Sequence, residues 1–277
     1  MTYGTLYLCA TPIGNLQDIT LRVLETLETV DLVACEDTRK TLQLLNHFNI
    51  SKPVTSYYEH NKMTKGDVII QHLKDGKHVA LVSDAGMPGV SDPGYDLVQQ
   101  CLAEDIPFTV LPGPVAAVTA LVLSGLPTDR FCFEGFIPRH KKERQQYFER
   151  LLKEERTMIF YESPHRLEDT LKTMAEVFPE RPMAAARELT KKFEEIVRGT
   201  PAEVLAHFEQ NGIRGEFVLL LHGAEPAAPE TRDIDWAVAR VAQLEAEGIS
   251  QKDAIKQAAK EADLSKRDVY NFIVQNK

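Results

Sequence analysis

The sequence has few cysteines and no long apolar run, and both shortages restrict the protein class. Its four cysteines, Cys9, Cys35, Cys101 and Cys132, are far apart and form no Cys-x-x-Cys pair. Three of them lie in apolar, strand-like segments, so we expect buried free thiols and neither disulfides nor a metal site. No segment approaches the about 18 uninterrupted apolar residues of a membrane span, and the N-terminal segment has no basic leader. We therefore expect a cytoplasmic protein without membrane contact.

Excess positive charge and the common nucleotide-binding motifs are also missing. The net charge is −9, so any nucleic acid has to be bound through a local basic patch. No two glycines are separated by a single residue, which excludes the G-x-G-x-x-G fingerprint and the glycine-rich loop of common methyltransferases. The P-loop, H-E-x-x-H and G-x-S-x-G motifs are absent as well. A nucleotide-like ligand must therefore be held in another way.

Short apolar segments rich in β-branched residues alternate with amphipathic segments over most of the chain. Strands are predicted within 5–10, 31–35, 53–58, 78–83 and 107–111, then within 131–135, 157–162, 183–187, 193–199 and 216–223, with helices at 141–154 and 164–177. The alternation of the first five strands with helical segments is typical of βαβ units and a largely parallel sheet. Because a domain averages about 150 residues, we predict an α/β fold with one α/β domain at 1–112 and another at 113–225.

The composition of the chain changes after residue 223. Segment 224–233 is rich in proline and alanine and predicts an exposed linker. Helical patterns follow near 235–246, 250–261 and 265–276, so 233–277 is predicted to be a small helical appendage. It has the outline either of a helix-turn-helix or of a three-helix packing or dimerisation module. Ser250 and Ser265 are predicted N-caps, each with an aspartate three residues later, as is Asp18 in the first domain.

Five conspicuous loops follow the strands of the first predicted sheet. They are TPIGN at 11–15, EDTR at 36–39, YEHN at 58–61, SDAGMPGVSDPG at 83–94 and LPGPVAA at 111–117. Glycine and proline in a single loop are explained by turn formation alone. Open α/β sheets, however, bind ligands beyond the carboxyl ends of parallel strands. Five such loops at one edge therefore predict a ligand site.

These loops belong to a series of motifs with a recognisable order and spacing. The series comprises TPIGNLQDITLR, EDTR, SDAGMPGVSDPG, LPGPVAAVTALVLSGLP, FYESPHR, RELTK and GEFVLLL, over about residues 3–224. It closely resembles the small-subunit ribosomal RNA methyltransferases of the tetrapyrrole methylase superfamily, the class III methyltransferases. The resemblance implies two α/β domains with S-adenosylmethionine bound between them, and a homodimer. It also implies methylation of a cytidine 2′-hydroxyl in the decoding region of 16S rRNA in the small ribosomal subunit.

The resemblance also implies which residues bind the cofactor. Asp84 is a suitable acceptor for a ribose or amino group, and glycine allows close backbone approach. The start of the helix after the fifth strand offers free amides to a carboxylate. Turn formation by Asp84 and core packing by Tyr161 and Leu189 are the simpler alternatives. The expected cofactor-binding residues are Pro12, Asp84, Gly86, Met87, Gly113, Ala116, Ala117, Tyr161, Leu189 and Glu216.

Methylation of a ribose hydroxyl requires a group that removes its proton and a cation that stabilises the forming alkoxide. The ionisable candidates in the motifs are Glu36, Asp37, Arg39, His60, Glu162, His165, Arg187, Glu188 and Lys191. We favour Glu36 and Lys191 as the catalytic pair. The alternative is that these charges form interdomain salt bridges or bind phosphate.

RNA requires exposed positive charge. Arg139, Lys141, Lys142 and Arg144 occur together, with His140, at the start of a predicted helix. Cations at a helix N-terminus oppose the macrodipole, which favours a phosphate partner over a merely solvated helix start. Further expected RNA contacts are Arg39 in EDTR and, in the tail, Lys266 and Arg267.

Two other functions are compatible with the sequence. One is methylation of a tetrapyrrole carbon, as in the uroporphyrinogen and precorrin enzymes, but a small macrocycle requires neither the basic segment nor the tail. The other is a non-catalytic RNA-binding protein on the same fold. A pure scaffold has no use for so many polar loops at one sheet edge.

Overall fold

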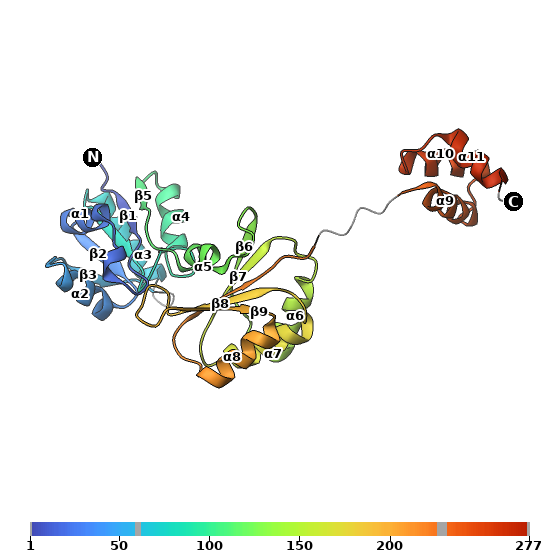
Figure 1. The fold of residues 1–277 in the computed structure, drawn as a ribbon. Helices are drawn as coiled ribbons and strands as arrows, with labels where there is room; N and C mark the ends of the chain where they lie inside the picture. Colours follow the sequence, from blue (N-terminus) through green and yellow to red (C-terminus); the bar gives the residue numbers. More distant parts are fainter. Residues whose placement is uncertain (1, 59–61, 226–231, 276–277) are drawn as a thin grey trace. The chain divides into compact units, whose positions relative to one another are not determined.

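The computed structural model describes residues 2–58, 62–225 and 232–275, and the chain divides into two compact units, Met1–Ala224 and Glu225–Lys277 (Figure 1). The first unit contains two five-stranded sheets. We call each sheet with its helices a lobe. The helical tail forms the second unit.

The first lobe is built on a parallel sheet of order β3-β2-β4-β1-β5. Its strands are β1 (Leu6–Cys9), β2 (Leu32–Cys35), β3 (Val54–Ser56), β4 (Val79–Val82) and β5 (Phe108–Leu111), and its helices are η1 (Leu16–Asp18), α1 (Leu21–Thr29), α2 (Thr38–His47), α3 (Lys62–Lys74) and α4 (Tyr95–Ala103). Leu8 and Leu81 pack in a cluster with residues of α3 and α4, whereas Val33 and Val82 pack with residues of α1 and α2. Burial on both faces explains why the central strands β2, β4 and β1 are almost entirely apolar.

The predicted cap of the first helix was wrong. Asn15 accepts a hydrogen bond from the Gln17 amide at 3.0 Å and starts a separate 3₁₀ turn that ends at Asp18. The helix α1 begins after this turn, and its N-cap is Thr20, whose hydroxyl accepts from the Val23 amide at 3.2 Å.

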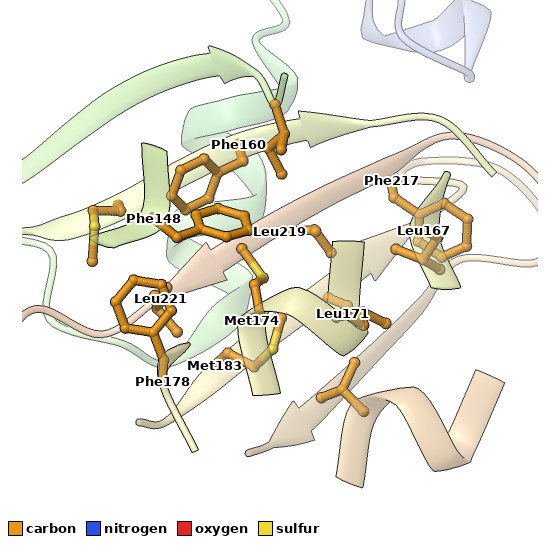
Figure 2. Packing of buried hydrophobic residues seen from close by; sticks show 14 of the residues in the cluster. Phe148, Phe160, Leu167, Leu171, Met174, Phe178, Met183, Phe217, Leu219 and Leu221 are labelled. Carbon is orange, nitrogen blue, oxygen red and sulfur yellow. The ribbon is translucent and has the colours of Figure 1, made fainter. Parts of the chain in front are cut away.

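The second lobe contains a mixed sheet of order β6-β7-β10-β8-β9, in which only β6 and β7 are parallel. Its elements are α5 (Ala116–Ser124), β6 (Phe131–Phe136), α6 (Lys141–Arg150), β7 (Thr157–Glu162), α7 (Leu167–Val177), β8 (Met183–Arg187), β9 (Glu195–Gly199), α8 (Pro201–Asn211) and β10 (Phe217–Leu221). Phe148 of α6 and Met174 of α7 pack with Leu219 on one face of the sheet (Figure 2). Leu121 of α5 packs with Ile159 in a second cluster, which involves β7, β8 and β10.

The tail consists of α9 (Ile234–Ala246), α10 (Gln251–Glu261) and α11 (Lys266–Gln275), and it has its own apolar core, which includes Val241, Ile255 and Val269. The predicted N-caps are confirmed: Ser250 accepts from the Asp253 amide at 3.3 Å, and Ser265 accepts from the Asp268 amide at 3.1 Å. Residues 226–231 of the predicted linker lie outside the described residues. In the part of the chain that is described, no helix is long and apolar enough to cross a membrane.

The four cysteines are free thiols, as predicted, and Cys132 is only partly buried. Burial raises the pKa of the Cys9 thiol to about 12, and those of Cys101 and Cys132 to about 11. Burial also raises the pKa of Cys35. These thiols are therefore protonated and unreactive in the folded chain. Within the described ranges, no group of three or more His, Cys, Asp or Glu side chains is arranged to hold a metal.

Candidate functional site

A cavity of about 480 Å³ is lined by both lobes, and we call it the interlobe cavity. Its size is in the range of small-molecule sites, about 300–1,000 Å³. It lies where the loops after β1 and β4 leave the parallel sheet, at the carboxyl ends of the strands. The lining residues are Ile13, Lys40, Asp84, Ala85, Gly86, Met87, Val90, Ser91, Asp92, Val115, Ala116, Phe136, Tyr161, Glu162, Ser163, Pro164, Glu188, Leu189, Lys191, Glu216, Phe217 and Val218.

Most residues expected to bind a cofactor line this cavity, namely Asp84, Gly86, Met87, Ala116, Tyr161, Leu189 and Glu216. Pro12, Gly113 and Ala117 do not line it. Pro12 precedes the lining residue Ile13, and the backbone of Ala117 is near enough to the Tyr161 hydroxyl to lower its pKa, although burial raises that pKa more. A Cβ on Gly113 would be 2.7 Å from the Ala10 Cβ, so this glycine allows the chain after β5 to pass close to β1.

Asp84 connects the loop after β4 to the start of α2. One carboxylate oxygen accepts from the Asp37 amide at 3.0 Å, and the other accepts from Lys40 Nζ at 2.8 Å. Lys40 lines the cavity, whereas the Arg39 side chain is 86% exposed and pairs with Asp37. This pairing lowers the pKa of Asp37 to about 2. The motif EDTR thus contributes to the cavity through the lysine that follows it, which the sequence analysis missed.

Carboxylates accumulate on the first-lobe side of the cavity. Glu36 is exposed, but partial desolvation raises its pKa, and the negative charges of Asp84 and Asp92 raise it further. Burial is the main cause of the raised pKa of Asp92, which lines the cavity; Glu36 does not line it. Asp92 was not among the predicted site residues, because its motif, S-D-P-G, has the composition of an ordinary turn.

The RELTK loop carries a strained backbone and a lysine that lines the cavity. Glu188 and Thr190 have φ angles of 50° and 65°, a region that β-branched residues rarely occupy. Lys191 Nζ lies 2.9 Å from Glu188 Oε1, and the Glu188 amide donates to the Glu216 carbonyl at 3.3 Å. Strain of this kind persists only where surrounding contacts hold it in place, and it is concentrated at functional sites.

Four other ionisable candidates are engaged in structural contacts, lie away from the cavity or fall outside the described residues. Glu162 is 3% exposed and accepts from Arg166 Nε at 2.8 Å and from the Thr170 hydroxyl at 2.7 Å. Arg187 pairs with Glu195 at 2.5 Å on β9. His165 is exposed and does not line the cavity, and His60 lies outside the described residues.

Among the expected RNA contacts, Arg139, Lys141 and Lys142 are exposed at the start of α6, and Lys266 and Arg267 are exposed on α11. The expectation for Arg144 must be corrected. Its side chain is 3% exposed, and its guanidinium donates to the Thr173 hydroxyl of α7 at 3.0 Å and to the Arg139 carbonyl at 3.3 Å. Arg144 therefore fixes α6 against α7 and is not available to RNA.

Comparison with known proteins identifies the fold. Residues 5–205 match the family Tetrapyrrole (Corrin/Porphyrin) Methylases. Among solved structures, a Thermus thermophilus uroporphyrin-III C-methyltransferase is 21% identical with a TM-score of 0.55, covering 79% of this chain and 94% of that one. The cobalt precorrin-4 methyltransferase is 19% identical with a TM-score of 0.59 and the same coverage. The fold is therefore that of a tetrapyrrole methylase.

Curated relatives with higher sequence identity show which family within this fold the chain belongs to. Proteins named ribosomal RNA small subunit methyltransferase I are 49% identical in Halalkalibacterium halodurans, over 98% of this chain and 95% of that protein, and 45% identical in Bacillus subtilis, over 97% and 93%. A Thermotoga maritima protein of the same name is 47% identical over 222 residues, which are 80% of this chain and the whole of that protein. The chain belongs to the ribosomal RNA small subunit methyltransferase I family.

Proposed function

We propose that this protein transfers the methyl group of S-adenosylmethionine to the 2′-hydroxyl of a cytidine in the decoding region of 16S rRNA. The observation that carries the proposal is the interlobe cavity, with carboxylates and lysines on its wall, in a chain of this family. The substrate is the rRNA or the small ribosomal subunit, which places the protein in the cytoplasm.

The cavity fits the chemistry of the methyl donor, which carries an adenosine, a sulfonium, an ammonium and a carboxylate. Asp84 and Glu216 provide negative charge for the two cations. No side chain caps the N-terminus of α5, so amides of its first turn, near Ala116, remain for the donor carboxylate. Another Thermus thermophilus uroporphyrin-III C-methyltransferase structure, 18% identical with a TM-score of 0.54, is a complex with S-adenyl homocysteine.

We assign the cofactor residues on this basis. The side chains or backbone of Asp84, Gly86, Met87, Ala116, Tyr161, Leu189 and Glu216 contact the donor. Pro12, Gly113 and Ala117 act less directly, by shaping the loops and, for Ala117, by lying near the Tyr161 hydroxyl. Gly86 has a φ of 84°, which favours glycine where the loop backbone approaches the ligand.

The reaction would form a bond between the ribose oxygen and the donor methyl carbon while the bond from that carbon to the sulfonium sulfur breaks. S-adenosylhomocysteine would leave as the neutral thioether, and the hydroxyl proton would pass to a base. We assign proton removal to Glu36, whose raised pKa makes it a better base than an ordinary glutamate. We assign stabilisation of the forming negative charge on the oxygen to Lys191. Positioning of the two reacting atoms by the cavity wall supplies much of the remaining rate.

A transfer assay tests the proposal directly. Radiolabelled S-adenosylmethionine is incubated with the protein and either small ribosomal subunits, their free rRNA or a uroporphyrinogen, and the modified nucleotide is mapped by mass spectrometry. We expect label in rRNA at one cytidine ribose. Label in the macrocycle alone would identify a tetrapyrrole methyltransferase, and no heat of donor binding in calorimetry would indicate a non-catalytic protein.

Gly14 follows the lining residue Ile13 and lies against the RELTK loop, so its replacement tests the donor assignment. A Cβ at this position would be 2.5 Å from Lys191 Cγ and 2.8 Å from the Leu189 carbonyl oxygen. Gly14→Ala should therefore displace the RELTK loop and weaken donor binding about 10-fold, the size of an overpacking penalty. Gly66→Ala on α3 is the control, because its Cβ would meet only the end of the Gln100 side chain. Calorimetric titration measures the donor affinity of both variants. Equal donor affinities of Gly14→Ala and Gly66→Ala would contradict the assignment.

The tail is proposed to add RNA affinity, with Lys266 and Arg267 as contacts. It has its own core, and the Thermotoga maritima relative is about as long as the first unit alone. Deleting residues after Glu230 should weaken RNA binding about 10-fold, because phosphate contacts are lost, and should leave donor affinity unchanged. Filter binding at two salt concentrations measures the loss, and Lys266→Ala/Arg267→Ala in the full chain should reproduce most of it. Unchanged RNA affinity would refute the role of the tail.

The proposed homodimer is supported by exposed apolar side chains on three consecutive elements of the first unit. They are Tyr95, Leu102, Val110, Val118 and Val122. Val122, which is 72% exposed, should be covered by the second copy. Val122→Glu would then raise the dimer dissociation constant about 10-fold or more, since it buries an unpaired charge. Sedimentation at several concentrations measures it, with Val68→Glu on α3 as the exposed-valine control. A monomeric wild type would refute the dimer.

A further inference from the structure

A β-bulge at the edge of the second sheet changes where one aromatic side chain points. The pairing of β6 with β7 shifts register between Phe133 and Gly135, and Gly135 has a φ of 69°. In a regular strand, residues three apart face opposite sides. Here Phe133 and Phe136 both contact the ring of Tyr161, with centroid distances of 4.9 Å and 5.6 Å. The bulge thus brings Phe136 to the face of the sheet that carries Tyr161.

The two phenylalanines have different surroundings. Phe133 is partly buried and packs against the apolar cluster under α5, whereas Phe136 is 62% exposed and lines the interlobe cavity. Its ring makes an edge-to-face contact with Tyr161, with an interplanar angle of 66°. An aromatic ring that lies at the wall of a cavity and is still largely exposed is suited to stack on a flat ligand.

Positive charge follows Phe136 directly along the chain. Arg139 is three residues further on, so the two Cα atoms are within about 11 Å of each other even if the chain is fully extended. Lys141 and Lys142 come next, at the exposed start of α6. A ring in the cavity wall followed by exposed cations matches a nucleotide whose base enters the site while its neighbouring phosphates stay outside.

We propose that Phe136 forms a stacking subsite for the base of the target nucleotide, which is turned out of the RNA strand into the mouth of the interlobe cavity. The inference rests on the proposed function and adds how the substrate is held. Enzymes that do chemistry on a base take it out of the stack, and proteins that recognise single-stranded RNA stack its splayed-out bases on aromatic side chains. Because every base has a π-face, Phe136 contributes affinity and position and does not select cytidine.

The test compares two replacements of Phe136 under single-turnover conditions with the small-subunit rRNA. Phe136→Leu keeps an apolar side chain and removes the aromatic face, whereas Phe136→Tyr keeps the face. Phe136→Leu should raise the RNA concentration for half-maximal rate about 10-fold, as expected for one lost base–aromatic stack, and Phe136→Tyr should stay within twofold of wild type. Phe131→Leu is the matched control, because Phe131 is exposed on the same strand and does not line the cavity.

Donor affinity, measured by calorimetry on the same variants, separates the other outcomes. The inference is supported if Phe136→Leu shows the expected rise in the RNA concentration for half-maximal rate while its donor affinity stays within twofold of wild type. It is overturned if Phe136→Leu leaves the RNA dependence unchanged, or if Phe136→Leu weakens donor binding instead, because the ring would then hold the donor's adenine. If the wild-type protein methylates no RNA, the proposed function itself fails; a normal wild type with an unaffected Phe136→Leu removes only the stacking subsite.

Discussion

Lys191→Ala is expected to slow methyl transfer in the bound complex about 100-fold or more, the usual effect of removing one group that stabilises a developing oxyanion. Lys191 lines the interlobe cavity, and its ammonium is held 2.9 Å from Glu188 Oε1, so it is a positioned cation and not a freely moving one. Single-turnover rates at saturating donor and RNA measure the chemical step. Lys192→Ala is the matched control, since the neighbouring lysine lies over the Phe193 ring and does not line the cavity.

Glu36→Gln should also slow methyl transfer about 100-fold, because the variant lacks the carboxylate that removes the hydroxyl proton. The wild-type rate should rise with pH, because the base acts as a carboxylate. The inflection should lie above the ordinary glutamate pKa, because partial desolvation and the charges of Asp84 and Asp92 raise it. Glu36→Gln should lose this inflection. Near-native rates in both Lys191→Ala and Glu36→Gln would remove the two residues from the chemistry, and an inflection lost only in Asp92→Asn would transfer the base to Asp92.

Arg166→Ala is expected to lower the free energy of unfolding by about 3–5 kcal/mol, because it leaves a buried carboxylate without its cation. The Glu162 side chain has no exposed surface, and Arg166 Nη2 lies 2.6 Å from its Oε1. For a unit of this size the loss corresponds to a decrease in Tm of roughly 10 °C. Thermal and denaturant unfolding of the full chain measure it.

The same helix offers the control for this prediction. Lys172 and Glu168 of α7 form another pair with i,i+4 spacing, but both side chains are about half exposed. Lys172→Ala should cost only about 0–0.5 kcal/mol, because water screens such a pair. Equal losses in Arg166→Ala and Lys172→Ala would show that burial of Glu162 is not what makes its pair important.

The fold was largely predictable because its signals are local. Strands buried on both faces are continuous apolar runs, and the amphipathic segments between them cover a sheet, so most elements follow from periodicity. The prediction for Arg144 was wrong because it rested on charge alone. It precedes Phe148 by four residues and Leu151 by seven, which is the spacing of a buried helix face, and attention to that pattern would have removed it from the basic patch.

The site was predictable only in part, because its contacts join distant segments. Asp84, Gly86 and Met87 follow a strand of the parallel sheet, so their place at the cavity could be expected from topology. Lys40 reaches the cavity through Asp84, 44 residues further along the chain, and no local pattern encodes this pairing. Phe136 reaches the cavity because of the β-bulge in β6, and the residue pattern of this strand does not show where a bulge occurs. The nature of the donor came from family resemblance and not from residue patterns.

Chemical modification of the native cysteines reports local opening of the folded chain. Cys9 and Cys35 lie in strands of the parallel sheet, and Cys132 lies in the edge strand of the mixed sheet. Because burial keeps the thiols of Cys9 and Cys35 protonated, an alkylating reagent modifies them mainly when their surroundings open. Their modification rates, read by peptide mass, therefore report how often the parallel sheet exposes its interior, and the partly buried Cys132 serves as the comparison, without any engineered label.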